Sequence, residues 1–121
     1  MATITPVREE VNNRIIRVTW SGLGQNDDGA GVNIPLVTHR AIQGTGDFSG
    51  NARFVIEGSL LENPSVDADW FRMMSPQRNS VSTIGVGDYM SSGPAFWIRP
   101  HILGGNGSTD INAILMFYKM V

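Results

Sequence analysis

The last quarter of the chain constrains the fold most. Two short apolar runs, 96–102 and 111–120, flank residues 104–110, which read Gly-Gly-Asn-Gly-Ser-Thr-Asp. Turns favour glycine, asparagine, serine and aspartate, whereas the flanking runs are rich in β-branched and aromatic residues, which favour strands. We therefore predict two strands joined in a β-hairpin with a long, glycine-rich tip, and the second strand closes the chain.

The rest of the sequence repeats this alternation of short strand and polar loop. No stretch keeps apolar residues at helical spacing for three turns without a break by one of the 14 glycines or six prolines. About six to eight short strands in one chain indicate an all-β fold, either a β-sandwich or a jelly-roll-like barrel of antiparallel strands. The other strands are predicted at 15–20, 34–42, 52–59, 70–73 and 81–84.

The first 13 residues differ in character from the rest. They are polar, contain Pro6 and end in two asparagines. We expect residues 1–13 to form an extended N-terminal arm, with room for one short edge strand around 3–7. Residues 14–121 are expected to form a single β-sandwich domain, which is an ordinary size for one domain and needs no disulfides.

Charge and cysteine content disfavour several classes of function. The net charge is −2, from nine basic and eleven acidic residues without a basic stripe, so neither nucleic acid nor an anionic membrane is an expected partner. No apolar run is long enough to span a bilayer, and the N-terminus lacks a secretory signal pattern. The chain has no cysteine, which suits a protein that folds in a reducing cytoplasm.

The sequence offers no catalytic motif. The two histidines, His39 and His101, lie in predicted strands, and no G-x-S-x-G nucleophile elbow is present. We expect histidines on a polar face or at a subunit contact, no catalytic residues and no enzyme activity. No cofactor is expected either, because the glycines at 44, 46 and 50 lack both the spacing and the following helix of a dinucleotide loop.

Two acidic clusters are candidates for calcium binding. They are Asn26-Asp27-Asp28 before Gly29, and the pair Asp67 and Asp69. Neither has the spacing of a calcium loop, and asparagine, aspartate and glycine together are ordinary turn residues. With two histidines and no cysteine, a structural zinc site is not expected. We predict turns at both places and no metal site.

The candidate binding residues lie in the strand 96–102. If Phe96, Ile98 and Pro100 face the core, alternation in an extended strand predicts that Trp97, Arg99 and His101 share the opposite face. Tryptophan, arginine and histidine together are typical of a protein contact patch. Alternatively, the sheet is covered on both faces, or Trp97 and Trp70 are stacking platforms for a carbohydrate.

Three groups of residues carry a family resemblance. They are Val18-Thr19-Trp20-Ser21-Gly22-Leu23 with Asp27-Asp28-Gly29 after it, Val55-Ile56-Glu57-Gly58-Ser59 followed by a tryptophan, and Trp97-Ile98-Arg99-Pro100 with 104–110. In this order, over residues 14–118, the chain resembles small virion proteins of tailed bacteriophages, the capsid decoration or cement proteins. It departs from their pattern at 59–63, where Ser-Leu-Leu-Glu-Asn stands in place of Gly-Ser-Asn-Asp-Gly.

The resemblance implies a structural function in the virion. The implied partner is the major capsid protein, the implied oligomer a homotrimer, and the implied location the capsid surface after synthesis in the host cytoplasm. An arm that orders on binding would add contacts at an entropic cost, and Pro6, Val7 and Arg8 are its candidate contact residues. The alternatives are another phage head or tail structural protein of similar fold, and a carbohydrate-binding β-sandwich module.

Overall fold

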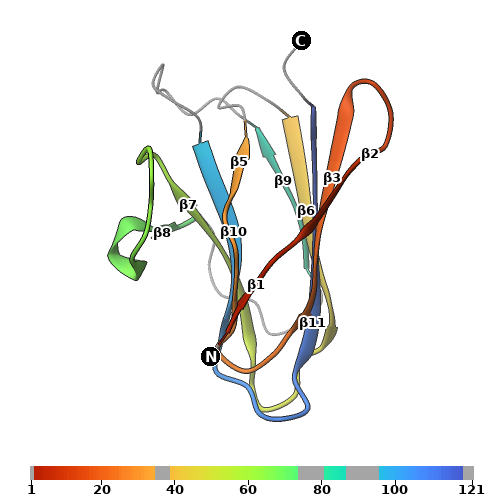
Figure 1. Ribbon diagram of the computed structural model, residues 1–121. Coiled ribbons are helices and arrows are strands. Elements are labelled where there is room, and N and C mark those ends of the chain that lie inside the picture. The colour runs from red at the N-terminus through yellow and green to blue at the C-terminus, as the bar shows by residue number, and fades with distance from the viewer. Residues whose placement is uncertain (1, 35–38, 74–80, 87–95, 119–121) are drawn as a thin grey trace.

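The chain folds into a β-sandwich. The computed structural model describes residues 2–34, 39–73, 81–86 and 96–118, and it shows two sheets packed face to face (Figure 1). The all-β prediction is confirmed. The only helical segment in these ranges is the short 3-10 helix η1 (Asp67–Asp69).

Sheet A has the strand order β1-β4-β10-β7-β8, and β5 also pairs with β10. All its pairs are antiparallel except β1 with β4. The strands are β1 (Thr3–Ile4), β4 (Asp28–Gly29), β5 (Val32–Ile34), β7 (Arg53–Ser59), β8 (Phe71–Arg72) and β10 (Phe96–Leu103).

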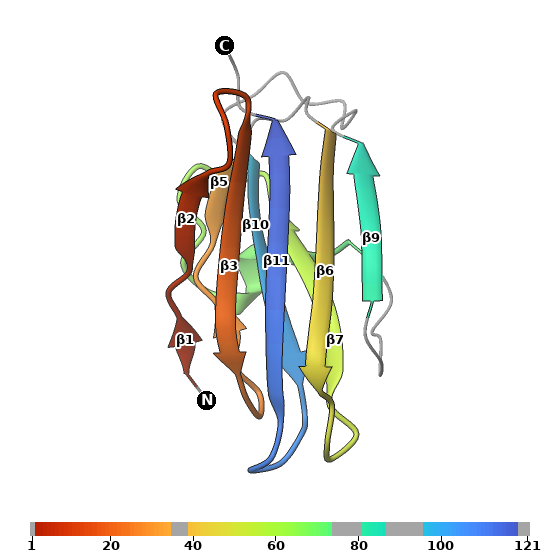
Figure 2. The same ribbon diagram turned by 90° about the vertical axis from the view of Figure 1, so that its right-hand side faces the viewer.

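Sheet B has the antiparallel order β2-β3-β11-β6-β9, with β11 at its centre (Figure 2). The long strands of sheet B pair along most of their length, and β11 contacts β3 on one side and β6 on the other. The strands are β2 (Val7–Glu10), β3 (Ile15–Leu23), β6 (His39–Asp47), β9 (Val81–Val86) and β11 (Asp110–Tyr118).

The predicted closing hairpin is wrong. Both of its strands exist, but β10 belongs to sheet A and β11 to sheet B, so the glycine-rich segment crosses from one sheet to the other at the end of the sandwich (Figure 1). Each strand has one apolar face. Stacking the two sheets buries these two faces against each other, whereas two strands paired within one sheet would not cover each other's apolar face. The predicted strand 34–42 divides for the same reason, because β5 ends at Ile34 in sheet A and β6 begins at His39 in sheet B.

The core lies between the two sheets. Alternation along β7 sends Phe54 and Ile56 into it, and Trp20 from β3 is fully buried there. The indole Nε1 of Trp20 donates to the carbonyl of Ala30 at 2.9 Å, so this polar group is satisfied inside the protein. The other large, fully buried side chains are Leu23, Ile34, Ile98, Ile102, Ile111, Leu115, Val18 and Val55.

Strand β6 extends beyond residue 42, where the sequence predicted that it would end. It reaches Asp47 because Gly46 adopts φ +128°, and a Cβ at Gly46 would lie 2.3 Å from the carbonyl oxygen of Asp110 on β11. Only glycine allows the two backbones to approach this closely. Sequence reasoning took the glycine as a loop residue, whereas here it lets two central strands pair.

The segment predicted as an arm contributes an edge strand to each sheet. β1 pairs with β4 in sheet A, and β2 pairs with β3 in sheet B. The outer edge of β2 carries charged side chains, and Glu9 pairs with Arg17 across the strands at 2.8 Å. Charges on an edge strand oppose pairing with other chains. In the structure, residues 2–10 are therefore part of the sandwich.

Candidate functional site

Trp97, Arg99 and His101 lie on the outer face of sheet A, turned away from sheet B. Ile98 and Ile102, which lie on the opposite face of the same strand, are buried in the core. The outer face is itself covered at this point, because Arg99 is only 7% exposed. Of the two arrangements that the sequence left open, the sheet covered on both faces is therefore the one found around Arg99.

Arg99 is the centre of a buried ionic network. Its Nε donates to Glu57 Oε1 at 2.8 Å, its Nη1 to Asp28 Oδ2 at 3.3 Å, and its Nη2 to Asp67 Oδ1 at 3.3 Å. Asp28 and Glu57 are buried with it, whereas the Asp67 side chain is 72% exposed. The planar, five-donor guanidinium suits such divergent carboxylates, and a lysine ammonium would not reach all three.

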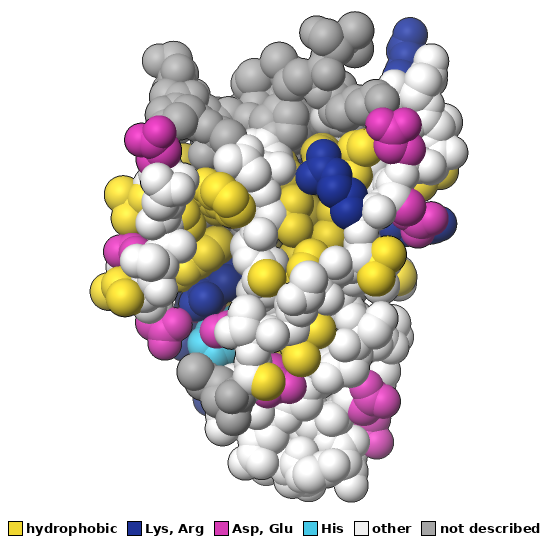
Figure 3. Space-filling view, viewed as in Figure 1, with side chains coloured by type: hydrophobic (Ala, Val, Ile, Leu, Met, Phe, Trp, Pro, Cys, Tyr) yellow, Lys and Arg dark blue, Asp and Glu magenta, His cyan; other side chains and the backbone are white. Residues whose placement is uncertain are grey.

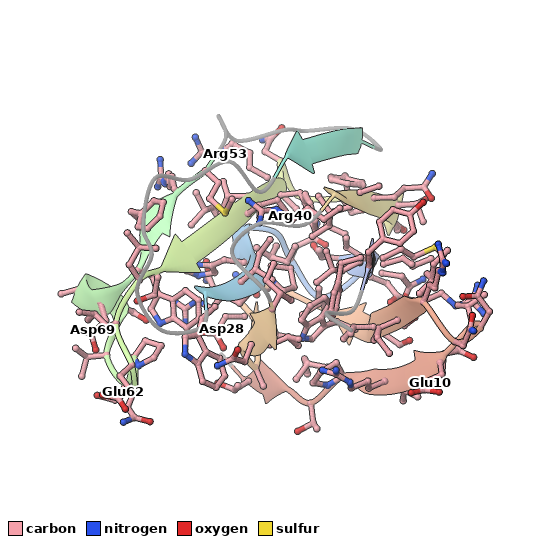
Figure 4. The ribbon with its side chains drawn as sticks, turned by 90° about the horizontal axis from the view of Figure 1, so that it is seen from above. Glu10, Asp28, Arg40, Arg53, Glu62 and Asp69 are labelled. Carbon is pink, nitrogen blue, oxygen red and sulfur yellow. The ribbon has the colours of Figure 1, made fainter. Side chains whose placement is uncertain are left out.

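Strand pairing brings these groups together. Arg99 on β10 is in register with Glu57 on β7, and the next residue of the same face on β10, His101, is in register with Asp28 on β4. Asp28 also accepts a hydrogen bond from Thr3 Oγ1 at 2.8 Å, which ties β1 to the network. Figure 4 shows Asp28 near the middle of the molecule, beside the strands of sheet A.

Glu57 is ionised at neutral pH. Burial raises the pKa of its carboxyl, but the hydrogen bond and charge of His101, whose Nδ1 lies 3.2 Å from Glu57 Oε1, and the charge of Arg99 together outweigh burial. The pKa of Glu57 therefore lies below its ordinary value. Glu57 thus occupies the Nε of Arg99, while Asp28 and Asp67 occupy its two terminal nitrogens.

The chain between β7 and β8 covers this network. The ring of Trp70 lies 4.4 Å from Cζ of Arg99, and Trp97 Nε1 donates to the carbonyl of Glu62 at 3.1 Å. Gly31 makes room for the rings, because a Cβ there would lie 2.7 Å from Trp70. Together with the ion pair of Asp67, these contacts hold the segment on sheet A.

The same segment turns apolar side chains outward. Leu60, Leu61, Val66 and Phe71 are 46%, 50%, 58% and 43% exposed, whereas the large apolar side chains of β7 are buried. Glu62, Asp67 and Asp69 lie among them, and residues 60–71 contain no lysine or arginine. We call these seven residues the 60–71 surface. Figure 3 shows hydrophobic and acidic side chains interspersed on this side of the molecule.

Comparison of the chain with protein-family models, with curated proteins and with solved structures finds no match.

The first acidic cluster is a turn only in part, because Asp28 belongs to strand β4. Asp27 accepts hydrogen bonds from the backbone N–H groups of Gly24 and Ala2, both at 2.8 Å, and Asn26 Oδ1 accepts from the backbone of Gly104. In the second cluster, the hydrogen bonds from the backbone of Ser65 and of Val66 lower the pKa of Asp69. Within the ranges that the structure describes, no group of three or more histidine, cysteine or acidic residues has the arrangement of a metal site.

The two histidines lie in different sheets, with His39 at the start of β6 in sheet B and His101 on β10 in sheet A. Among the described residues, no helix has the length and hydropathy needed to traverse a bilayer.

The candidate contact residues of the arm lie at sheet B. Pro6 is half-buried between β1 and β2, Val7 is 69% exposed, and Cζ of Arg8 lies 5.7 Å from the ring centre of Phe117 on β11. They are therefore on the opposite side of the sandwich from the 60–71 surface (Figure 1).

Sequence reasoning missed the partners of Arg99. The available signal was that Glu57 and Arg99 each stand in the middle of an otherwise apolar strand. A charge that is buried in a sheet needs an opposite charge beside it. Reasoning from one strand at a time did not pair them, since they are 42 residues apart in sequence.

Proposed function

We propose that this chain is a virion structural protein that decorates and braces the icosahedral capsid of a tailed bacteriophage. The observation that supports this function best is a rigid β-sandwich whose polar network is used internally, while one covered sheet presents a fixed apolar and acidic surface outward. Such a body is suited to binding by shape rather than to turning over a substrate.

The family resemblance agrees with this geometry. Asp28, Glu57 and Arg99 belong to the three groups of residues that carry it, and in the fold they meet in one network. One residue of each group therefore helps to hold the outer layer on sheet A. A capsid lattice offers many identical sites, so a modest affinity per copy suffices when neighbouring copies also touch one another.

A carbohydrate-binding module is the second candidate, since Trp70 and Trp97 both approach Gly31 on the outer face of sheet A. A stacking platform needs a free aromatic face. The Trp70 ring is stacked on Arg99, and the Trp97 indole is tied to Glu62. The contacts of both indoles thus favour a structural function over sugar binding, and a glycan array with Trp97→Ala as control tests this alternative.

Co-sedimentation with capsids tests the proposed function. Capsids from the phage that encodes the chain, prepared without it, are mixed with the purified protein at moderate salt and pelleted. We expect saturable binding at a fixed number of copies per capsid, and capsids that withstand a higher temperature when decorated. Capsids of an unrelated phage are the control. No association with its own capsid would refute the proposal.

Two further properties are checked with the same material. Mass spectrometry of separated heads and tails places the protein in the virion, and we expect it in the heads; recovery in tails alone would favour the alternative of a tail protein. Analytical ultracentrifugation of the purified chain gives its oligomeric state, for which we propose a homotrimer.

A further inference from the structure

We infer that the 60–71 surface is the face that docks on the capsid shell, and that its partner is an apolar depression bordered by lysine or arginine side chains. This inference rests on the proposed function. It names the docking side of the molecule and the chemistry of the shell surface.

The exposed apolar side chains are the first observation. Among the described residues, seven large hydrophobic side chains are exposed, and four of them, Leu60, Leu61, Val66 and Phe71, come from this one short segment. Contiguous apolar patches on the surface mark protein interaction sites, because water is a poor solvent for them. Of the other three, Val7 and Tyr118 lie on strands β2 and β11 of sheet B, and Val11 lies in the turn between β2 and β3.

The charge of the segment indicates the partner. Residues 60–71 contain three carboxylates and no basic residue. Arg99 compensates Asp67, but the Glu62 side chain is exposed, and the lowered pKa of Asp69 keeps its carboxylate ionised. Apolar side chains interspersed with carboxylates are complementary to an apolar depression that is bordered by basic side chains.

The segment is also held in shape before it binds. Arg99 contacts both Asp67 and Trp70, Trp97 binds the Glu62 carbonyl, and the backbone of Met73 donates to Ile56 on β7 at 2.8 Å. A surface that is already ordered loses little conformational entropy on docking. The buried network thus has a function at the interface, because it fixes the apolar side chains in position.

The opposite side of the molecule lacks this combination. Glu62 and Asp69 lie at one side of the sandwich and Glu10 of β2 at the other (Figure 4). Strand β2 carries Arg8, Glu9 and Glu10, so its one exposed apolar side chain, Val7, stands among charges. With the 60–71 surface on the shell, β2 and its Pro6, Val7 and Arg8 face away from it.

Matched double variants test the inference against undecorated capsids. Leu61→Ser with Val66→Ser removes two exposed apolar side chains from the 60–71 surface, and Val7→Ser with Val11→Ser removes two from the far side. We expect the first pair to weaken capsid binding by about tenfold or more, and the second by less than about twofold. Circular dichroism and thermal unfolding verify that each variant is folded.

A charge variant gives an independent readout if the first pair does not fold. Glu62→Lys alters only the exposed side chain, since the contact of Trp97 is with the Glu62 backbone. We expect it to weaken binding at low salt, with a smaller difference from the unaltered chain at high salt, where exposed charges are screened. Equal affinity of Glu62→Lys and the unaltered protein at low salt would contradict the basic rim.

The failures are distinguishable. If the unaltered chain binds capsids and only the Val7, Val11 pair weakens binding, the docking face is at β2 and this inference is wrong, while the proposed function stands. If the Leu61, Val66 pair instead dissolves a homo-oligomer without changing capsid affinity, the 60–71 surface is a contact between copies, which also overturns the inference. If the unaltered chain does not bind, both proposals fail.

Discussion

Replacement of Arg99 by methionine is the sharpest test of how the outer layer is held. Methionine keeps much of the length and apolar stem of the side chain but removes the charge. Asp28 and Glu57, which are 4% and 9% exposed, then lose their guanidinium partner. Removing one partner of a buried ion pair costs about 3–5 kcal/mol, because the remaining charge stays buried.

This loss is large for a domain of this size. Single domains are stable by about 5–15 kcal/mol, and 1 kcal/mol corresponds to about 4 °C in melting temperature at this length. We therefore expect Arg99→Met to lower the melting temperature by about 12–20 °C at neutral pH. Urea unfolding followed by tryptophan fluorescence measures the free energy of unfolding directly, and its slope should stay unchanged.

The chain contains a matched control. Arg17 contacts Glu9 with the same atoms and distance as Arg99 contacts Glu57, 2.8 Å from Nε to Oε1, but Arg17 and Glu9 are exposed at 41% and 50% of their side chains. Since solvent screens an exposed pair, Arg17→Met should be close to neutral. An Arg99→Met variant that is no less stable than Arg17→Met would refute the network as the clamp of the outer layer.

A second substitution separates the charge from the packing. Adding Glu57→Gln to Arg99→Met removes one of the stranded carboxylates, so the double variant should be more stable than Arg99→Met alone. If the double variant is instead less stable, by the sum of the two single losses, the two residues act independently and the ionic account is wrong.

Three other predictions follow from the same geometry. The pKa of Glu57 is lowered in the folded state, so its contribution to stability is complete above the ordinary glutamate value of about 4.5 and is lost as the pH falls through the lower folded-state value. In an acid titration, the stability of Glu57→Gln should therefore depend less on pH than that of the unaltered chain. Parallel stability curves for the two proteins would contradict this. Gly31→Ala places a Cβ 2.7 Å from Trp70, so we expect the free energy of unfolding to fall by roughly 1–3 kcal/mol and proteolysis within 60–71 to become faster. Gly107→Ala is the control, because a Cβ there meets no atom within 4 Å, and it should change neither stability nor proteolysis. Deletion of residues 2–10 removes β1, β2 and the Thr3 hydrogen bond to Asp28, so calorimetry should show a lower melting temperature, and an unchanged value would mean that the segment is a free arm.

The faces of the strands could be predicted from sequence, because a period of two residues is a local property. Alternation separated Arg99 from Ile98, and in the structure Ile98 lies in the core whereas Arg99 lies on the outer face. Local pattern does not identify the neighbour of a strand, however. β10 and β11 are adjacent in sequence and individually well predicted, yet they lie in different sheets because each is needed to cover the apolar face of the other sheet.

The candidate site was predictable only in part. Trp97, Arg99 and His101 were identified as sharing one face, but the burial of Arg99 depends on residues 60–70, whose sequence is typical of an exposed loop. Its strongest partner, Glu57, is brought beside it by the register of β7 with β10, which is a tertiary property. The exposure of Leu60 and Leu61 was equally hidden, since an apolar pair in a sequence is more often buried than exposed.

Electron cryomicroscopy of capsids with and without the protein tests the proposed function and its docking face most directly. The account predicts additional density at fixed lattice positions only when the protein is present, into which the two-layer sandwich fits with residues 60–71 against the shell and β2 toward solvent. A map with no added density would contradict capsid decoration, and a sandwich seated on β2 would contradict the docking face.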